Sequence, residues 1–102
     1  MSRLDSLLKI FDQYPDDIFT MYGLAMEYIS TKDYNTAEQY LKLIITKDSG
    51  YVPAYMQYAQ LKENLNQLDE AKSIYRAGID AAKKINDIRS AKEMENFLND
   101  IE

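Results

Sequence analysis

The sequence contains no cysteine and no histidine. Without cysteine, the chain can form neither disulfides nor thiolate metal sites. Without histidine, it lacks the most common general base and the most common metal ligand. No glycine-rich phosphate loop and no serine beside a plausible base compensates for these absences. We therefore expect a protein that is not an enzyme, with no catalytic residue, no metal site and no cofactor.

Glycine and proline are also scarce, with 3 and 2 residues among 102. Many short strands would need frequent turns, and turns are rich in these two residues. Long helices need the fewest turns, so the composition favours an all-α fold. The chain has the length of one domain, and its 46% hydrophobic and 28% charged residues are typical of a folded protein.

No part of the chain is strongly basic, since the net charge is −5 and only segment 52–85 is positive, by a single charge. Phosphate neutralisation needs a basic patch, so we expect no nucleic-acid partner and no DNA-binding helix-turn-helix. Near the N-terminus, Asp5, Lys9 and Asp12 interrupt a short apolar stretch, unlike a signal peptide or a membrane span. A cytoplasmic protein without a membrane partner is expected.

Apolar residues recur at the helical period of 3.6 in six stretches of the sequence. Ser2, followed three residues later by Asp5, resembles a capping box at the start of the first stretch. The other expected boundary signals are N-caps at Asp16 or Asp17 and at Asn35, a left-handed exit at Gly50, Pro53 in a first turn, and Lys83 and Lys84 in a last turn.

Segments 18–51 and 52–85 share one apolar pattern when the first is shifted by 34 residues. Small residues recur where helices would approach closely, and large apolar residues recur where gaps need filling. Three positions are identical: Ala25/Ala59, Ala37/Ala71 and Ile45/Ile79. A helical hairpin of this length cannot bury its apolar faces alone, so such units stack on copies of themselves. We expect one helical hairpin, present twice.

This pattern resembles the tetratricopeptide-repeat (TPR) family. The family's first helix typically carries a large residue, a leucine, a small residue and a tyrosine, matched by Met21, Leu24, Ala25 and Tyr28. Its second helix carries a small residue, an aromatic and another small residue, matched by Ala71, Tyr75 and Gly78. The chain departs from the family pattern at Ile44, which stands where the second copy has Gly78, and at Lys62, which stands where the first has Tyr28.

The resemblance implies an all-α, right-handed α-α superhelix, a TPR-like solenoid. It implies a single domain over residues 1–102. Segment 2–14 would be the leading helix of an incomplete repeat, 18–51 and 52–85 would be full repeats, and 87–101 would be a capping helix.

The helix expected after residue 18 has an apolar arc of roughly 220°, counted at 100° per residue. Only Thr20, Gly23, Glu27 and Ser30 lie outside this arc. An arc that wide must meet neighbours on more than one side. In the TPR family the corresponding helices line a concave groove, which implies the partner-binding residues Phe19, Tyr22, Met26, Ile29, Met56 and Gln60. Pro53 and Glu63 or Asn64 are further groove positions in the second copy.

We therefore expect a protein-interaction module or scaffold that binds a peptide or partner segment in a groove lined by aromatic residues and methionine. One TPR subclass binds acidic C-terminal peptides through Lys, Asn and Arg at groove positions. Those positions hold Tyr22, Met26, Met56 and Gln60, so such a peptide is not expected. The alternative is structural self-association, as a homodimer or by stacking of residues 3–11, with no separate ligand. The first and last helices could also cover the groove.

Other conspicuous residues are expected to be structural. The carboxylates on outward faces, expected to be solvated, are Glu27, Glu38, Glu63, Glu70 and Asp80. The tyrosines at expected core positions are Tyr28, Tyr40, Tyr55, Tyr58 and Tyr75. Tyr22 does not fit that core stripe.

Overall fold

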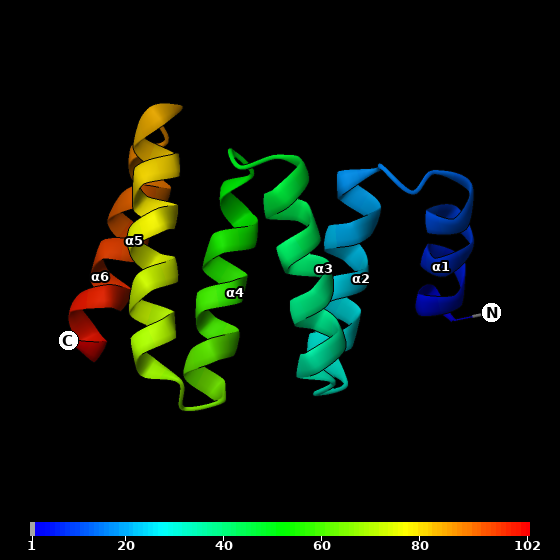
Figure 1. Ribbon diagram of the computed structural model, residues 1–102, viewed down its shortest axis with the longest axis horizontal. Helices are drawn as coiled ribbons and strands as arrows, with labels where there is room; N and C mark the ends of the chain where they lie inside the picture. The colour runs from blue at the N-terminus through cyan, green and yellow to red at the C-terminus, as the bar shows by residue number, and fades with distance from the viewer. Residues whose placement is uncertain (1) are drawn as a thin grey trace. The chain divides into compact units, whose positions relative to one another are not determined.

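The computed structural model describes residues 2–102, which form six α-helices (Figure 1). No strand occurs in this part of the chain. The helices separate into two compact units, one extending to Lys47 and the other covering Asp48–Glu102. The prediction of an all-α fold with six helices is confirmed.

The first unit consists of α1 (Arg3–Gln13), α2 (Ile18–Ser30) and α3 (Tyr34–Lys47). Helix α2 packs against both α1 and α3. The centre of this unit is made of side chains that are 0% exposed: Met21, Leu24 and Ala25 on α2, and Ala37, Leu41 and Ile44 on α3. The two alanines that the repeat pattern singled out on these helices are therefore core residues.

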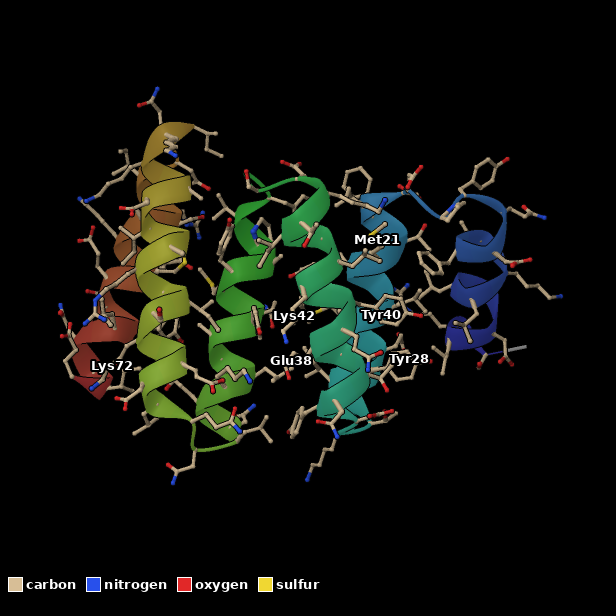
Figure 2. All side chains as sticks on the ribbon, viewed as in Figure 1. Met21, Tyr28, Glu38, Tyr40, Lys42 and Lys72 are labelled. Carbon is tan, nitrogen blue, oxygen red and sulfur yellow. The ribbon has the colours of Figure 1, made fainter. Side chains whose placement is uncertain are left out.

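Aromatic rings connect the three helices of the first unit (Figure 2). Tyr28 on α2 and Tyr40 on α3 stack, with ring centroids 5.9 Å apart and an interplanar angle of 8°. Phe11 on α1 meets Tyr40 edge-on, at 5.6 Å and 81°. Pairs of these two kinds stabilise a fold by about 0.5–1.5 kcal/mol beyond their buried area. Among the five tyrosines expected in the core, Tyr55 and Tyr75 are buried, whereas Tyr28, Tyr40 and Tyr58 are half-buried.

Helix α1 lies against a side of α2 outside the expected apolar arc. Gly23 is buried, and a Cβ atom at this position would be 3.2 Å from Leu7 Cδ2. Glycine therefore lets Leu7 approach the backbone of α2. Thr20 is also buried, at 4% exposure, and its hydroxyl donates to Asp17 Oδ2 at 2.5 Å. This side of α2 is a packing surface, which the sequence pattern did not indicate.

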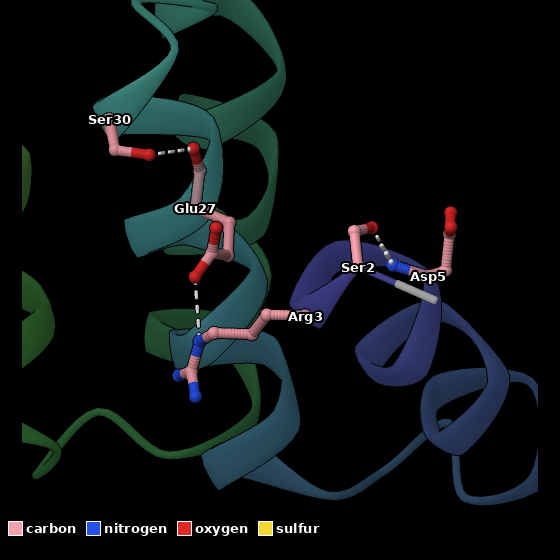
Figure 3. Close-up of polar contacts among 5 residues, drawn as sticks. All are labelled: Ser2, Arg3, Asp5, Glu27 and Ser30. Atoms are coloured by element: carbon pink, nitrogen blue, oxygen red, sulfur yellow. Dashed lines mark hydrogen bonds and ion pairs between the residues drawn. The ribbon is translucent and has the colours of Figure 1, made fainter.

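Polar contacts hold the start of α1 (Figure 3). Arg3 Nε is 2.6 Å from Glu27 Oε1, which joins α1 to the last turns of α2. Ser2 Oγ accepts a hydrogen bond from the Asp5 N–H at 3.1 Å, so the predicted cap of α1 is confirmed. Helix α1 contains no buried residue. It is consequently the least enclosed helix of its unit.

The second unit consists of α4 (Val52–Asn64), α5 (Leu68–Lys84) and α6 (Ile88–Ile101). Helix α5 packs against both α4 and α6. A Cβ atom at Gly78 on α5 would be 2.6 Å from Met94 Sδ on α6 and 2.7 Å from Tyr55 Cβ on α4. Real Cβ contacts are not this short, so only glycine lets both neighbours come this close to α5. The close packing of α4 and α6 on α5 therefore explains why the repeat pattern has a small residue at this position.

Three helix ends share one kind of turn, whose central residue has a positive φ: Lys32 (63°), Asn66 (58°) and Asn86 (60°). After α2, the Lys32 N–H donates to the Ile29 carbonyl at 2.9 Å. At the 34-residue offset, the Asn66 N–H donates to the Glu63 carbonyl at the same 2.9 Å. This is part of the Schellman pattern, which satisfies the free carbonyls at a helix end. The two copies of the repeat therefore share this backbone hydrogen bond as well as their apolar pattern.

Two expected helix boundaries are wrong. Helix α3 begins at Tyr34, so Asn35 lies within its first turn, and Asp33 Oδ1 instead accepts the Thr36 N–H at 3.3 Å. Gly50 does not adopt a positive φ. Its N–H instead donates to Asp48 Oδ1 at 3.0 Å, so a side chain rather than a left-handed residue shapes this turn.

The predicted cap of α2 is confirmed only in its position, whereas the predictions for α4 and α5 are confirmed. Asp17 precedes α2 as its N-cap, but its side chain makes no capping hydrogen bond. The neighbouring Asp16 pairs with Lys47 Nζ at 2.5 Å instead of capping α2. The positions confirmed by the structure are Pro53 in the first turn of α4 and Lys83 and Lys84 in the last turn of α5.

Candidate interaction surfaces

The first candidate surface is one side of α2, formed by Phe19, Tyr22, Met26 and Ile29, and is called the α2 face below. Intervals of three, four and three residues place these side chains on the same side of the helix. Phe19 is 77% exposed, and the other three are half-buried. None of the four predicted site residues on α2 is buried within the chain.

Packing inside the first unit decides which side of α2 stays accessible. Met21 and Leu24 are 0% exposed in the core, while Gly23 receives Leu7 from α1. Helix α2 therefore has neighbours on more than one side, but α1 contacts it at Gly23, outside the apolar arc, so this contact does not account for the width of the arc. On the α2 face, Phe19 is 77% exposed and the other three side chains are half-buried.

The second candidate surface is the corresponding side of α4, formed by Met56, Gln60, Glu63 and Asn64, and is called the α4 face below. Met56 and Gln60, the two predicted site residues on this helix, are both half-buried. At the 34-residue offset they correspond to two residues of the α2 face. The α4 face differs from the α2 face because most of its side chains are polar.

A hollow of about 290 Å³ adjoins the α4 face, lined by Gln60, Glu63, Asn64 and, from α6, Phe97. Behind it lies Tyr75, which is 0% exposed and whose hydroxyl donates to Glu63 Oε2. The Tyr75 and Phe97 rings stack at a centroid distance of 5.9 Å and an interplanar angle of 21°. The carboxylate and the aromatic wall of the hollow are therefore both anchored on one buried tyrosine.

The Tyr75 hydroxyl is a hydrogen-bond donor over the whole neutral pH range. Burial raises its pKa above the ordinary value, and the hydrogen bond to Glu63 and the charge of that carboxylate raise the pKa further. Sequence reasoning placed Tyr75 in the core but missed both this bond and Phe97. A signal was available: a buried tyrosine needs an acceptor, and Glu63 is the polar residue at the offset position of Ile29.

Most carboxylates expected to be solvated have partners in the structure. The pairs are Glu27 with Arg3, Glu38 with Lys42 on α3 (Figure 2), Glu63 with Tyr75, and Glu70 with Lys62. Glu70 and Asp80 are exposed, as expected of solvated faces, whereas Glu27, Glu38 and Glu63 are half-buried.

Lys62 is unusual because it is only 7% exposed. Its Nζ lies 2.7 Å from Glu70 Oε2 and 2.9 Å from Gln67 Oε1, and 5.8 Å from the centroid of the Tyr58 ring. These contacts compensate the charge that burial would otherwise disfavour. They explain how a lysine can replace the tyrosine found at this position in the first copy.

A second hollow, of about 380 Å³, lies elsewhere in the second unit. Its lining residues are Ser49, Gly50, Tyr55, Ala77, Asp80, Ala81, Lys84 and Ile85. The Tyr55 hydroxyl donates to the Ser49 carbonyl at 2.7 Å, and burial together with the nearby Asp48 charge raises the Tyr55 pKa. The Tyr55 hydroxyl in this hollow therefore already has an acceptor within the unit.

The α2 face and the α4 face carry side chains that can contact another molecule. Within residues 2–102, no group of three or more acidic side chains is arranged to hold a metal ion. No helix in the described part of the chain combines the length and the apolarity that crossing a bilayer requires. The two faces supply apolar contact, ring stacking and hydrogen bonds.

Two helical hairpins with matching cores, turns and small residues define a helical-repeat protein. The family model for the tetratricopeptide repeat matches residues 28–94, which is more than half of the chain. The chain therefore belongs to the TPR family, and the resemblance found in the sequence is confirmed. TPR domains mediate protein–protein interactions, and the family is generally non-enzymatic.

Solved structures support the same fold. A TPR domain protein from Salinibacter ruber, solved by NMR, is similar with a TM-score of 0.82 and 27% identity, covering 86% of this chain and 89% of that one. A crystal structure of a TPR domain protein from the same organism gives 0.77 and 26%, covering 83% and 94%. The TPR2B domain of yeast Sti1, in complex with pHsp70, gives 0.88 and 17%, covering 96% and 78%. No curated protein matches the sequence.

Proposed function

We propose that this chain is a protein-interaction module that binds an apolar peptide or partner segment on the α2 face of the first unit. Met56 and Gln60 of the α4 face are proposed partner contacts of the second unit, considered separately. The observation that carries the proposal is the exposure of Phe19, at 77%, next to three half-buried apolar side chains on the same side of α2. Exposed apolar patches on folded proteins commonly mark interaction sites.

The chemistry of the α2 face suits a partner of variable shape. Phe19 and Tyr22 supply large contact areas at a low cost in side-chain entropy. Met26 is unbranched and polarizable, so it can adapt to irregular surfaces. Binding would remove these side chains from water at about 25 cal/mol per Å² of apolar area, before the costs of association. The partner we expect is therefore an apolar segment carrying few charges.

The test is a selection of peptides from a displayed library on the purified chain, followed by affinity measurements with the double variant Tyr22→Ala/Met26→Ala. We expect the variant to bind at least about tenfold more weakly, because truncating interface anchors costs more than about 1 kcal/mol each. The matched control is Ile85→Ala/Ile88→Ala, which removes apolar side chains that are 56% and 54% exposed in the second unit. Equal affinities for the wild type and the Tyr22/Met26 variant would exclude the α2 face.

Self-association is the second candidate, and one observation favours it. Helix α1 has no buried residue, and its Leu8 and Ile10 are 37% and 41% exposed. A second copy packing on α1 would cover part of this exposed apolar surface. Light scattering at micromolar concentration decides between the two functions. A mass of 11.9 kDa at all concentrations would exclude self-association, whereas a dimer dissociated by Leu8→Glu/Ile10→Glu would support it.

A further inference from the structure

The hollow beside the α4 face holds two amide side chains that have no hydrogen-bond partner among residues 2–102. Gln60 and Asn64 make no side-chain hydrogen bond among the described residues. Their amide groups each carry an oxygen that can accept and a nitrogen that can donate. Both line the same hollow as the Phe97 ring. The polar groups are therefore available to a molecule that enters it.

Glu63 gives this hollow a fixed negative charge. The Tyr75 hydroxyl donates to Glu63 Oε2, and no described donor hydrogen-bonds to Oε1. No lysine or arginine among residues 2–102 forms an ion pair with Glu63, and none lines the hollow. Since Tyr75 is 0% exposed and cannot move freely, the carboxylate is held in place before any ligand arrives.

We propose that the hollow receives an arginine side chain from a protein partner, which rests on the proposed function of the chain as a protein-interaction module. The guanidinium stacks on the Phe97 ring, donates to Glu63, and reaches the amide oxygens of Gln60 or Asn64. Arginine suits this set of groups because it has five N–H donors, no acceptor, and a planar surface that stacks on aromatic rings. Lysine has a single point charge and cannot stack in this way.

The size and the charge of the surroundings agree with this assignment. A hollow of about 290 Å³ is at the lower limit of ligand pockets, which are typically about 300–1,000 Å³, so it fits one side chain better than a whole small molecule. The chain carries a net charge of −5, which favours the approach of a cationic segment.

The first experiment uses N-acetyl-arginine methylamide as the probe and its citrulline analogue as the uncharged control of equal shape. Binding to the full-length ¹⁵N-labelled chain is followed by NMR. We expect saturable shifts of the Gln60 and Asn64 side-chain amide signals with the arginine probe alone. In Glu63→Gln, which keeps an acceptor for Tyr75, we expect the dissociation constant to rise about tenfold. The control Asp100→Asn removes the same charge at an exposed position of α6 and leaves binding unchanged.

Two results overturn the arginine assignment. Equal shifts with the citrulline probe show that charge is not recognised, and equal weakening by Asp100→Asn and Glu63→Gln shows only general attraction to an acidic chain. Phe97→Leu is a further check, because it keeps apolar volume and removes the stacking surface. It should weaken the arginine probe while circular dichroism and the unfolding midpoint show that the fold is retained.

The second experiment uses the peptides selected on the purified chain. Replacement of a peptide arginine by citrulline should weaken binding to the wild type about tenfold and leave binding to Glu63→Gln unchanged. Peptides that bind through the α2 face without any arginine overturn this inference and leave the proposed function standing. The opposite outcome is that the arginine probe binds in the hollow but no selected peptide loses affinity in Tyr22→Ala/Met26→Ala. That outcome would contradict the proposed function instead.

Discussion

The two helical hairpins place different chemistry at the same positions. Ile29 and Leu41 in the first unit correspond, at an offset of 34 residues, to Glu63 and Tyr75 in the second. Leu41 and Tyr75 are both 0% exposed. Leucine needs no hydrogen-bond partner, whereas a buried tyrosine hydroxyl needs one, and Glu63 supplies it. The paired change therefore preserves the core and alters the surface.

This difference gives the two faces different chemistry. The α2 face stays apolar along its length, and the α4 face becomes polar toward its end, where Glu63 and Asn64 adjoin the hollow. The shared small residues, Ala25 with Ala59 and Ala37 with Ala71, are 0% exposed in both copies. Packing thus restricts some positions of the repeat, and the remaining positions can specify a partner.

The largest effect is expected where the second copy has a glycine and the first has an isoleucine. Gly78→Ile would place a branched side chain against Met94 Sδ and Tyr55 Cβ, which lie only 2.6 Å and 2.7 Å from the point that a Cβ atom on this residue would occupy. We expect the free energy of unfolding to fall by about 3 kcal/mol, as in strongly overpacked cores.

Urea denaturation measures this loss, with Gly50→Ala as the control glycine variant. Gly50 has no positive φ, and a Cβ atom there would meet only Asp48 Oδ1, at 3.4 Å. The control should change the stability by no more than about 0.5 kcal/mol. A Gly78→Ile protein as stable as the control would show that α4 and α6 do not pack tightly on α5.

A smaller effect is expected from the Glu63–Tyr75 pair. Glu63→Ile reproduces the residue of the first copy and leaves the buried Tyr75 hydroxyl without its acceptor, which we expect to cost about 1–3 kcal/mol. In Glu63→Ile/Tyr75→Phe both partners are removed, so the loss should be smaller than the sum of the single losses by about 1 kcal/mol. Additive losses in the double-mutant cycle would show that the bond does not stabilise the fold.

The same pair predicts a dependence of stability on pH. The pKa of Tyr75 is raised in the folded chain, so the unfolded chain loses this proton first as the pH rises above about 10, the ordinary tyrosine value. The stabilisation is fully present below that pH and declines above it. Unfolding midpoints at about pH 8 and about pH 10.5 should therefore fall more for the wild type than for Tyr75→Phe. Parallel declines would contradict the raised pKa.

The smallest effect concerns the two equivalent turns. Lys32 and Asn66 both have positive φ, a conformation that asparagine adopts more readily than lysine. Lys32→Asn should stabilise the chain by about 0.5 kcal/mol, and Asn66→Lys should destabilise it by a similar amount. Thermal unfolding of both variants measures the difference. Shifts in the same direction would show that backbone strain does not determine the residue at this turn.

The repeat could be predicted from sequence because its strongest constraints are local. Small residues such as Ala25, Ala59 and Gly78 indicate where helices contact each other closely. The period of the apolar residues indicates which side of each helix is buried. The α2 face could be predicted for the same reason, since the width of an apolar arc depends only on the order of residues along one helix.

The contacts that were missed depend on which helix lies opposite. The sequence places Gly23 on the polar side of α2, and only the position of Leu7 shows that this side is a packing surface. The sequence predicts a solvated Glu63 because its partner, Tyr75, is on another helix. The sequence predicts a cap at Asn35, whereas Asp33 performs that role in the structure. The two residues have equivalent capping chemistry, so only the start of the helix distinguishes them.

The most direct test of the proposed binding surface is an NMR titration of the ¹⁵N-labelled chain with a peptide selected for binding. The proposal predicts the largest shifts at Phe19, Tyr22, Met26 and Ile29, with smaller ones at Met56 and Gln60. Shifts confined to α1 or to the exposed side of α5, with the α2 face unaffected, would contradict it.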